Sequence, residues 1–93
     1  MEKEIRAYIL VSGRVQGVFF RKYIRKKAGI IGVNGFVKNL PNKKVECVFE
    51  GQRDRVEKML KWVKKGSFFA RVDNIEIKYE KFKHKFKNFE IRY

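Results

Sequence analysis

The chain is poor in cysteine, histidine, proline and acidic residues, and these shortages exclude several classes of protein. Cys47 is the only cysteine among 93 residues, so no intrachain disulfide can form. Together with His84, the only histidine, it is too little for a recognisable zinc site, and we expect no metal and no cofactor. No apolar run approaches the roughly 20 residues that a membrane helix needs, and no apolar signal segment is visible. We therefore expect a cytoplasmic protein without a membrane partner.

Acidic residues are scarce relative to basic ones, with 10 Asp and Glu against 24 Lys and Arg and a formal charge of +14. Such a charge suits a nucleic-acid partner, a small anionic substrate or a solvated lysine-rich surface, and composition alone does not choose among them. The length and the 44% hydrophobic content indicate a single domain over residues 1–93 with a thin core. Pro41 is the only proline, and no repeat or low-complexity linker is visible.

Apolar residues recur with the periods of five strands and two helices. Strands are predicted over residues 5–12, 35–40, 44–50, 75–80 and 89–93, and helices over residues 20–31 and 54–65. Gly32 is expected to end the first helix, and Asn42 to take a left-handed conformation in the hairpin turn. Cys47 should be a small core residue. The order β-α-β-β-α-β-β predicts an α+β protein, a ferredoxin-like split βαβ sandwich whose mostly antiparallel sheet carries two helices on one face.

The segment between the first strand and the first helix has the composition of an anion-binding loop. Gly13 and Gly17 allow backbone conformations in which successive N–H groups converge, and the following helix adds its positive N-terminal end. Arg21 lies in the first turn of that helix, where a cation is disfavoured unless an anion lies nearby. Its planar guanidinium matches two oxygens of a phosphate or carboxylate. Spacing alone also allows an ordinary β-to-α connection whose arginine points into water.

This segment resembles the signature of the acylphosphatase family. The signature has a glycine, a variable residue and Val-Gln-Gly-Val, followed by a variable residue, an aromatic and an arginine; residues 13–21 fill every fixed position. The second family motif, a Gly-aromatic-small-basic-Asn run before a strand that ends in glycine, is matched by residues 35–39 and Gly51. Three departures stand out. Lys43 replaces the usual hairpin glycine, and Ser67-Phe68-Phe69 replaces a segment that is usually rich in proline. Gly29 lies within a helix that normally carries better helix formers.

The resemblance implies hydrolysis of a small anionic acyl phosphate to a carboxylate and inorganic phosphate, without metal or covalent intermediate. Arg21 and Asn39 would be the catalytic residues, with Arg21 on the phosphate and Asn39 on the attacking water. Backbone N–H groups of a loop would bind the phosphate, and the loop residues are Val15, Gln16, Gly17, Val18, Phe19 and Phe20. Inorganic phosphate would be both product and inhibitor, and we expect a monomer.

The residues support this reaction independently. A carboxylate leaves as a stable anion, with a pKa near 4, so the reaction has little need of a general acid. Asn39 lies on a predicted strand, where asparagine is depleted, and its carboxamide can both accept from a water and donate to phosphate. Taken alone, Asn39 is better explained as a strand-end residue that satisfies a nearby turn, and its match to the family motif favours the catalytic role.

Two other functions remain open. A nucleic-acid-binding module of the RRM type has the same element order, and a basic chain suits it. However, residues 44–50 lack the spaced aromatic pair of that module and carry Glu46 and Glu50, which would repel phosphate, so nucleic acid is not expected as the main partner. A catalytically silent interaction domain is the second alternative, and the presence of both Arg21 and Asn39 argues against it.

Overall fold

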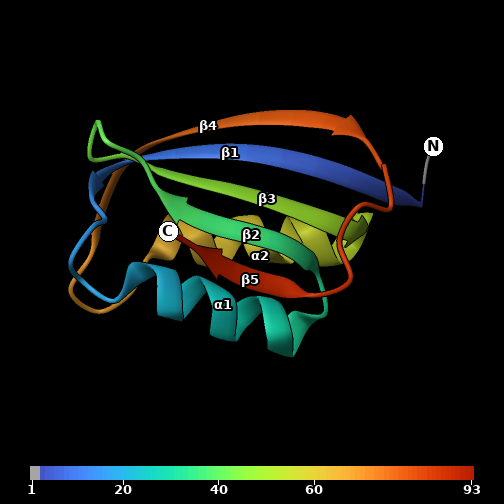
Figure 1. Ribbon diagram of the computed structural model, residues 1–93, viewed down its shortest axis with the longest axis horizontal. Helices are drawn as coiled ribbons and strands as arrows, with labels where there is room; N and C mark the ends of the chain where they lie inside the picture. Colours follow the sequence, from blue (N-terminus) through green and yellow to red (C-terminus); the bar gives the residue numbers. More distant parts are fainter. Residues whose placement is uncertain (1–2) are drawn as a thin grey trace.

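The computed structural model describes residues 3–93, in which two helices pack on one face of a five-stranded sheet (Figure 1). The elements are β1 (Glu4–Arg14), α1 (Phe20–Ile31), β2 (Asn34–Asn39), β3 (Val45–Gln52), α2 (Arg53–Lys65), β4 (Arg71–Lys81) and β5 (Phe89–Arg92). The strand order is β4-β1-β3-β2-β5, and only the β2–β5 pair is parallel among the pairs described. This arrangement confirms the predicted split βαβ sandwich.

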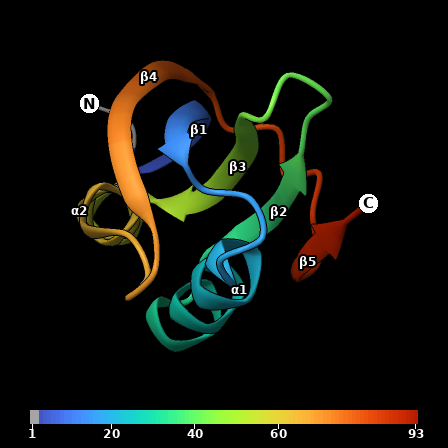
Figure 2. The same ribbon diagram turned by 90° about the vertical axis from the view of Figure 1, so that its left-hand side faces the viewer.

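Strand direction brings three distant parts of the chain together at one end of the sheet. β1 and β2 each run antiparallel to β3, and β5 runs parallel to β2. β1, β2 and β5 therefore run the same way, and their carboxyl ends lie at the same end of the sheet, on the left in Figure 1. Figure 2 looks onto that end, where the loop after β1, the hairpin between β2 and β3, and the end of β5 meet.

The core lies between the sheet and the two helices. Alternate residues of β1 and β3 point toward the helices, because successive side chains of a strand face opposite sides. The buried side chains from β1 and the helices are Ile5, Ala7, Ile9, Val11, Phe20, Ile24, Ala28, Val56, Met59, Leu60 and Val63. Cys47 is fully buried, as predicted for a core residue, and burial raises the pKa of its thiol.

Most predicted boundaries are confirmed, while the edge strands differ. α1 has the predicted bounds, and Gly32 ends it with a φ of 90°. β4 starts at Arg71, earlier than predicted, because it also pairs with the end of β1 beyond a bulge. Tyr79 and Tyr93 alternate with charged residues in the sequence, yet they are 53% and 89% exposed. Both belong to the outermost strands or follow them, where the helices give little cover.

The hairpin turn also differs from the prediction. Lys43, not Asn42, takes the left-handed conformation, with a φ of 71°. Asn42 instead uses its side chain, whose Oδ1 accepts a hydrogen bond from the backbone N–H of Lys44 at 3.1 Å. This hydrogen bond stabilises the tight turn, which a glycine at position 43 would favour through its conformational freedom.

A buried carboxylate holds residues 82–88 on the open face of the sheet, which is the face away from the helices. Glu50 of β3 is 1% exposed and accepts the backbone N–H groups of Lys83 and Lys85, each at 2.9 Å. The Arg6 guanidinium donates to the same carboxylate at 3.3 Å. These bonds satisfy a charge whose burial would otherwise be costly.

The same segment covers Phe36, an aromatic residue on the open face of the sheet, which is the face that an RRM would use to stack bases. Phe36 of β2 is only 9% exposed, because Phe86 packs edge-on against it at 5.9 Å between ring centres. The Arg92 guanidinium lies over the Phe36 ring at 4.2 Å. A base could not stack on Phe36 in this arrangement, since both ring neighbours would have to move.

The Glu50 contacts predict a specific acid sensitivity. Burial by itself raises the pKa of Glu50, but hydrogen bonds from Lys85, Lys83 and Arg6 outweigh it, so the pKa in the folded protein lies below its ordinary value. Glu50 therefore contributes stability above the pKa of an unfolded glutamate, about 4.3, and loses it as the pH falls through the folded pKa. We predict that Glu50→Gln flattens the loss of unfolding free energy below about pH 5.

Urea denaturation at a series of pH values measures this slope. Glu57→Gln, which changes an exposed carboxylate on α2, is the matched control and should keep the wild-type slope. If Glu50→Gln has the same acid dependence as the wild type, the assignment of a lowered pKa to Glu50 is wrong.

Candidate active site

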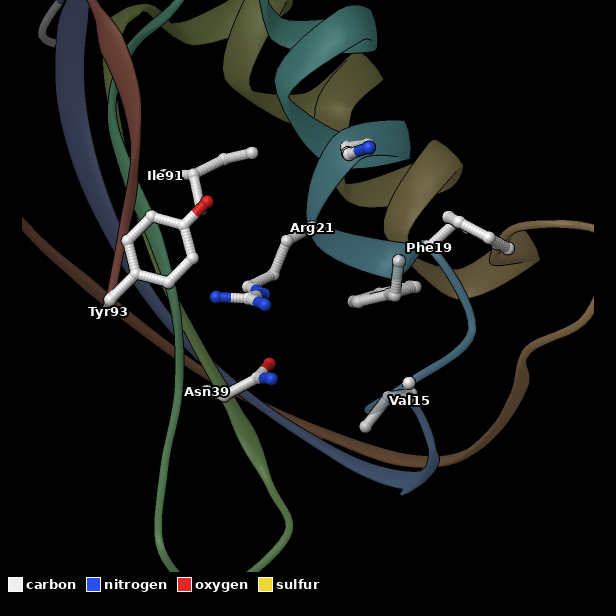
Figure 3. Close-up of a pocket in the computed structure, with 9 residues that line it drawn as sticks. Val15, Phe19, Arg21, Asn39, Ile91 and Tyr93 are labelled. Atoms are coloured by element: carbon white, nitrogen blue, oxygen red, sulfur yellow. The ribbon is translucent and has the colours of Figure 1, made fainter.

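A cavity of about 270 Å³ lies at the end of the sheet where β1, β2 and β5 finish (Figure 3). Its nine lining residues are Val15, Gly17, Phe19, Phe20, Arg21, Lys22, Asn39, Ile91 and Tyr93. Six of the eight site residues predicted from the sequence are among them. The side chains of Gln16 and Val18 do not line the cavity, and Lys22, Ile91 and Tyr93 were not predicted.

Gly13, near the end of β1, and Gly17, in the loop, both have a positive φ that favours glycine. Gly13 has a φ of 128°, and a Cβ there would lie 2.2 Å from the carbonyl oxygen of Arg71, so only glycine fits beside β4. Gly17 has a φ of 70° and open space around it, which makes its backbone conformation, rather than crowding, the reason for glycine.

Phe19 also has a positive φ, 61°, which the sequence did not predict. A left-handed conformation costs a residue with a side chain about 1–3 kcal/mol, and such strain often marks functional sites. The ring of Phe19 is 66% exposed, so burial of the ring does not repay that cost. Phe19 is also the residue that immediately precedes α1, and its conformation turns the chain from the loop into the helix.

The first turn of α1 faces the cavity with free donors. No side chain caps the helix, and its first turn contains no acidic residue. Helix N-termini carry backbone N–H groups without intrahelical acceptors and a partial positive charge. Val15 and Val18, at 1% and 6% exposure, anchor the loop in the core beneath these donors. The loop and helix start are thus held in a shape that can accept an anion.

Arg21 and Asn39 approach the cavity from different elements. Figure 3 shows the Arg21 guanidinium extending from α1 and the Asn39 carboxamide extending from β2, directed toward each other. The guanidinium carbon lies 4.7 Å from the centre of the Tyr93 ring. Arg21 forms no ion pair with a carboxylate within residues 3–93, so its charge is available to a ligand.

The Asn39 side chain has an unusual unsatisfied atom. Its Oδ1 is buried and accepts no hydrogen bond from any residue in the described part of the chain. A buried acceptor without a partner costs about 1–3 kcal/mol, so it is uncommon in a folded protein. A group that enters the cavity with an N–H or O–H can donate to this oxygen.

Gln16 joins the two halves of the site, although the sequence suggested only a backbone role for it. Its Nε2 donates to the carbonyl oxygens of Leu40 at 2.8 Å and of Lys44 at 2.9 Å. Leu40 directly follows Asn39, and Lys44 lies opposite it at the base of the β2–β3 hairpin, where its carbonyl oxygen also accepts the Leu40 N–H at 2.8 Å. The signal in the sequence was that Gln16 is the one polar residue in the otherwise apolar or glycine run of residues 15–20.

Ser67 ties a second loop to the first. Its Oγ donates to the carbonyl oxygen of Val18 at 3.1 Å, and its own carbonyl accepts from the Ala70 N–H at 3.0 Å. Ser67 belongs to the segment that departs from the family pattern. The adjacent Phe68 is 93% exposed, so its ring packs on little of this loop.

Comparison with known proteins identifies the family. The acylphosphatase family model matches residues 7–91. The chain belongs to the acylphosphatase family. A curated acylphosphatase from Syntrophobacter fumaroxidans is 46% identical over 88 residues, which cover 95% of this chain and 91% of that protein. The family hydrolyses acyl phosphates, so the protein is a hydrolase of acid anhydrides.

Solved acylphosphatase structures have the same fold. The Bacillus subtilis protein superposes with a TM-score of 0.92 at 32% identity, covering 96% of this chain and 99% of that one. The Coxiella burnetii protein gives 0.90 at 37% identity, with 97% and 94% covered. Both likenesses confirm the ferredoxin-like prediction.

Neither a membrane span nor a metal cluster is found within residues 3–93. No helix there is long and apolar enough to cross a bilayer. No three side chains of His, Cys, Asp or Glu gather in positions that could hold a metal ion.

We predict that Gln16→Ala loosens the hairpin that carries Asn39. Loss of two hydrogen bonds to partly buried carbonyls should lower the unfolding free energy by about 1–2 kcal/mol, measured by urea denaturation. Hydrogen exchange at Leu40 and Lys44 should accelerate more than in the core. Arg14→Ala, an exposed change beside the same loop, serves as the control and should stay within about 0.5 kcal/mol. Unchanged exchange in the hairpin would contradict the role given to Gln16.

Proposed function

We propose that the cavity binds the phosphoryl group of a small acyl phosphate and directs a water molecule onto its phosphorus. The backbone N–H groups of residues 15–20 and the Arg21 guanidinium bind the phosphate oxygens, and Asn39 holds the water. The arrangement of Arg21 and Asn39 carries this proposal: a cation without a carboxylate partner and a buried unsatisfied acceptor face the same space.

The loop and Arg21 supply what phosphoryl transfer requires of a protein. The reaction involves a transition state with negative charge on the equatorial phosphate oxygens, and catalysis consists mostly of positioning and charge stabilisation. Fixed backbone donors provide that stabilisation without reorganising during the reaction. Arg21 adds a planar pair of donors, which suits two oxygens at once.

Asn39 is suited to the water because its carboxamide has both kinds of hydrogen-bonding atom. The buried Oδ1 accepts an O–H from the water, while Nδ2 can donate to a phosphate oxygen. The water oxygen then bonds to phosphorus as the bond from phosphorus to the acyl oxygen breaks. The carboxylate leaves with that electron pair, and both water protons remain on the product as dihydrogen phosphate. No protein group needs to gain or lose a proton overall.

We propose that this reaction needs neither a metal nor a cofactor, because the loop and Arg21 provide the positive charge. Inorganic phosphate is the product and should compete for the same donors as an inhibitor. We also propose that the protein acts as a monomer in the cytoplasm, where its single buried thiol would stay reduced.

Replacing Arg21 by lysine should abolish most activity. A lysine keeps the charge but lacks the planar fork, so we expect loss of most kcat/KM for benzoyl phosphate, assayed with a chelator present, and weaker inhibition by phosphate. Arg14→Lys, an exposed change beside the loop, is the control and should behave as the wild type. Near-normal turnover and phosphate inhibition in Arg21→Lys would overturn the role of Arg21. Absence of turnover by the wild type with chelator would overturn the metal-free reaction.

Replacing Asn39 by alanine separates water positioning from a structural role. Misplacing a nucleophile by about 1 Å can cost on the order of a hundredfold, so kcat should fall at least that much. Phosphate should still inhibit with similar affinity, because the loop and Arg21 remain. The unfolding free energy should drop by no more than about 1 kcal/mol. Asn74→Ala on β4 is the control. If Asn39→Ala is easily unfolded yet turns over normally when folded, Asn39 is a turn residue.

A further inference from the structure

A second hollow, of about 480 Å³, adjoins the active-site cavity along α1. Lys22, Ile91 and Tyr93 line both spaces, so the two hollows are neighbours. The remaining lining residues are Arg25, Lys26, Gly29 and Ile30 of the helix. We call this hollow the α1 groove; it runs between α1 and β5.

The α1 groove presents an uncompensated cluster of positive charge. Lys22, Arg25 and Lys26 are spaced three and four residues apart, so they share one face of the helix. α1 contains five cations and no acidic residue. None of these cations forms an ion pair with a carboxylate within residues 3–93. Like charges at this spacing destabilise a helix, and a bound anion would relieve that repulsion.

Some cations on the open face of the sheet have carboxylate partners: Arg6, Lys78 and Arg92 each have one within 3.9 Å. Lys58 and Lys61 of α2 form no ion pair within residues 3–93, so the lack of carboxylate partners does not by itself distinguish the α1 groove. Its cations are distinguished by their position beside the active-site cavity.

Gly29 and Ile30 make part of the α1 groove open and apolar. A Cβ on Gly29 would meet no atom within 4 Å, so no packing contact requires glycine at this position. The neighbouring Ile30 is 69% exposed, and together with Ile91 it adds an apolar surface to the charged one. The groove therefore offers both apolar contact and cations.

The α1 groove adjoins the part of the cavity that Ile91 and Tyr93 line, and Asn39 does not line it. Attacking and leaving oxygens lie roughly in line across the phosphorus. With the water held at Asn39, the acyl group leaves on the side of the phosphorus away from Asn39, and the groove is a neighbouring space that Asn39 does not line.

We propose that the α1 groove receives the acyl part of the substrate and that Arg25 and Lys26 bind a second negative group on it. This inference rests on the proposed function and specifies its substrate as a small acyl phosphate whose acyl group carries a carboxylate. A small acid fits better than a long chain, because Lys22 to Gly29 span only about 10 Å along the helix.

Two matched substrates test the proposal: 4-carboxybenzoyl phosphate and its neutral methyl ester, 4-(methoxycarbonyl)benzoyl phosphate. The quantity measured is the ratio of their kcat/KM values, at about 0.15 M salt to screen distant charges. We expect the wild type to favour the carboxylate by about fivefold, which corresponds to two partly exposed charge contacts. The double variant R25Q/K26Q should bring the ratio close to one, without lowering the thermal unfolding midpoint.

The double variant K58Q/K61Q is the control, since it removes the same charge from exposed positions of α2. It should keep the wild-type ratio, and both double variants should affect the neutral ester to a similar extent. A wild-type ratio near one, or an equal fall in both double variants, overturns the subsite while leaving the hydrolase intact. Failure of the wild type to hydrolyse either compound overturns the proposed function as well.

Discussion

The site depends on three strands that run in the same direction. β3 lies between β1 and β2 and pairs antiparallel with both, which makes β1 and β2 parallel although they are not neighbours. β5 then joins β2 in parallel and ends at the same place. Because of this topology, a loop, a strand end and a terminal aromatic, far apart in sequence, surround one cavity. The crossover through α1 is what allows β1 and β2 to run in parallel, and the same helix supplies Arg21.

The contact that sets the spacing within that end of the sheet is the Gln16 side chain. The anion-binding loop and the β2–β3 hairpin belong to separate segments, and backbone pairing alone does not join their tips. Gln16 bonds to two carbonyls of the hairpin, and Ser67 bonds to the loop from the other side. Arg21 and Asn39 thus lie across a cavity whose width is determined by side chains that bind no substrate themselves.

Elements with strong periodicity were predictable from the sequence, and conformations decided by tertiary contacts were not. The stripes of α1 and α2 and the alternation of β1 follow from local pattern, so their faces were assigned correctly. Gly13 and Gly17 signalled the loop because only glycine adopts such angles freely. The left-handed conformation of Phe19 gave no signal, since phenylalanine normally avoids it. Lys43 gave no signal for the same reason, because lysine also disfavours a positive φ. In the turn, Lys43 and not the more permissive Asn42 takes the left-handed conformation.

For the candidate site, the sequence predicted which residues line the cavity better than it predicted which groups they contact. Arg21 and Asn39 were found through motifs, and six of the eight predicted residues line the cavity. The position of Tyr93 beside the cavity could not be predicted from the alternation of residues 89–93, which only groups Tyr93 with Phe89 and Ile91. Its ring lies beside Arg21 because β5 is at the edge of the sheet and ends just before it. The sequence around Glu50 likewise gave no sign that Glu50 would hold residues 82–88, because its hydrogen-bond donors are backbone groups more than 30 residues away.

The length of β4 has a consequence for how the protein behaves when crowded. β4 is an outer strand of eleven residues, and one of its sides has no neighbouring strand in the described sheet. Such an edge is a template on which a second chain could add a strand and begin aggregation. Six of the eleven residues of β4 are charged, and its register with β1 shifts at a bulge between Ser12 and Gly13. Both features oppose edge-to-edge pairing, so the free edge of β4 is a poor template for a second chain.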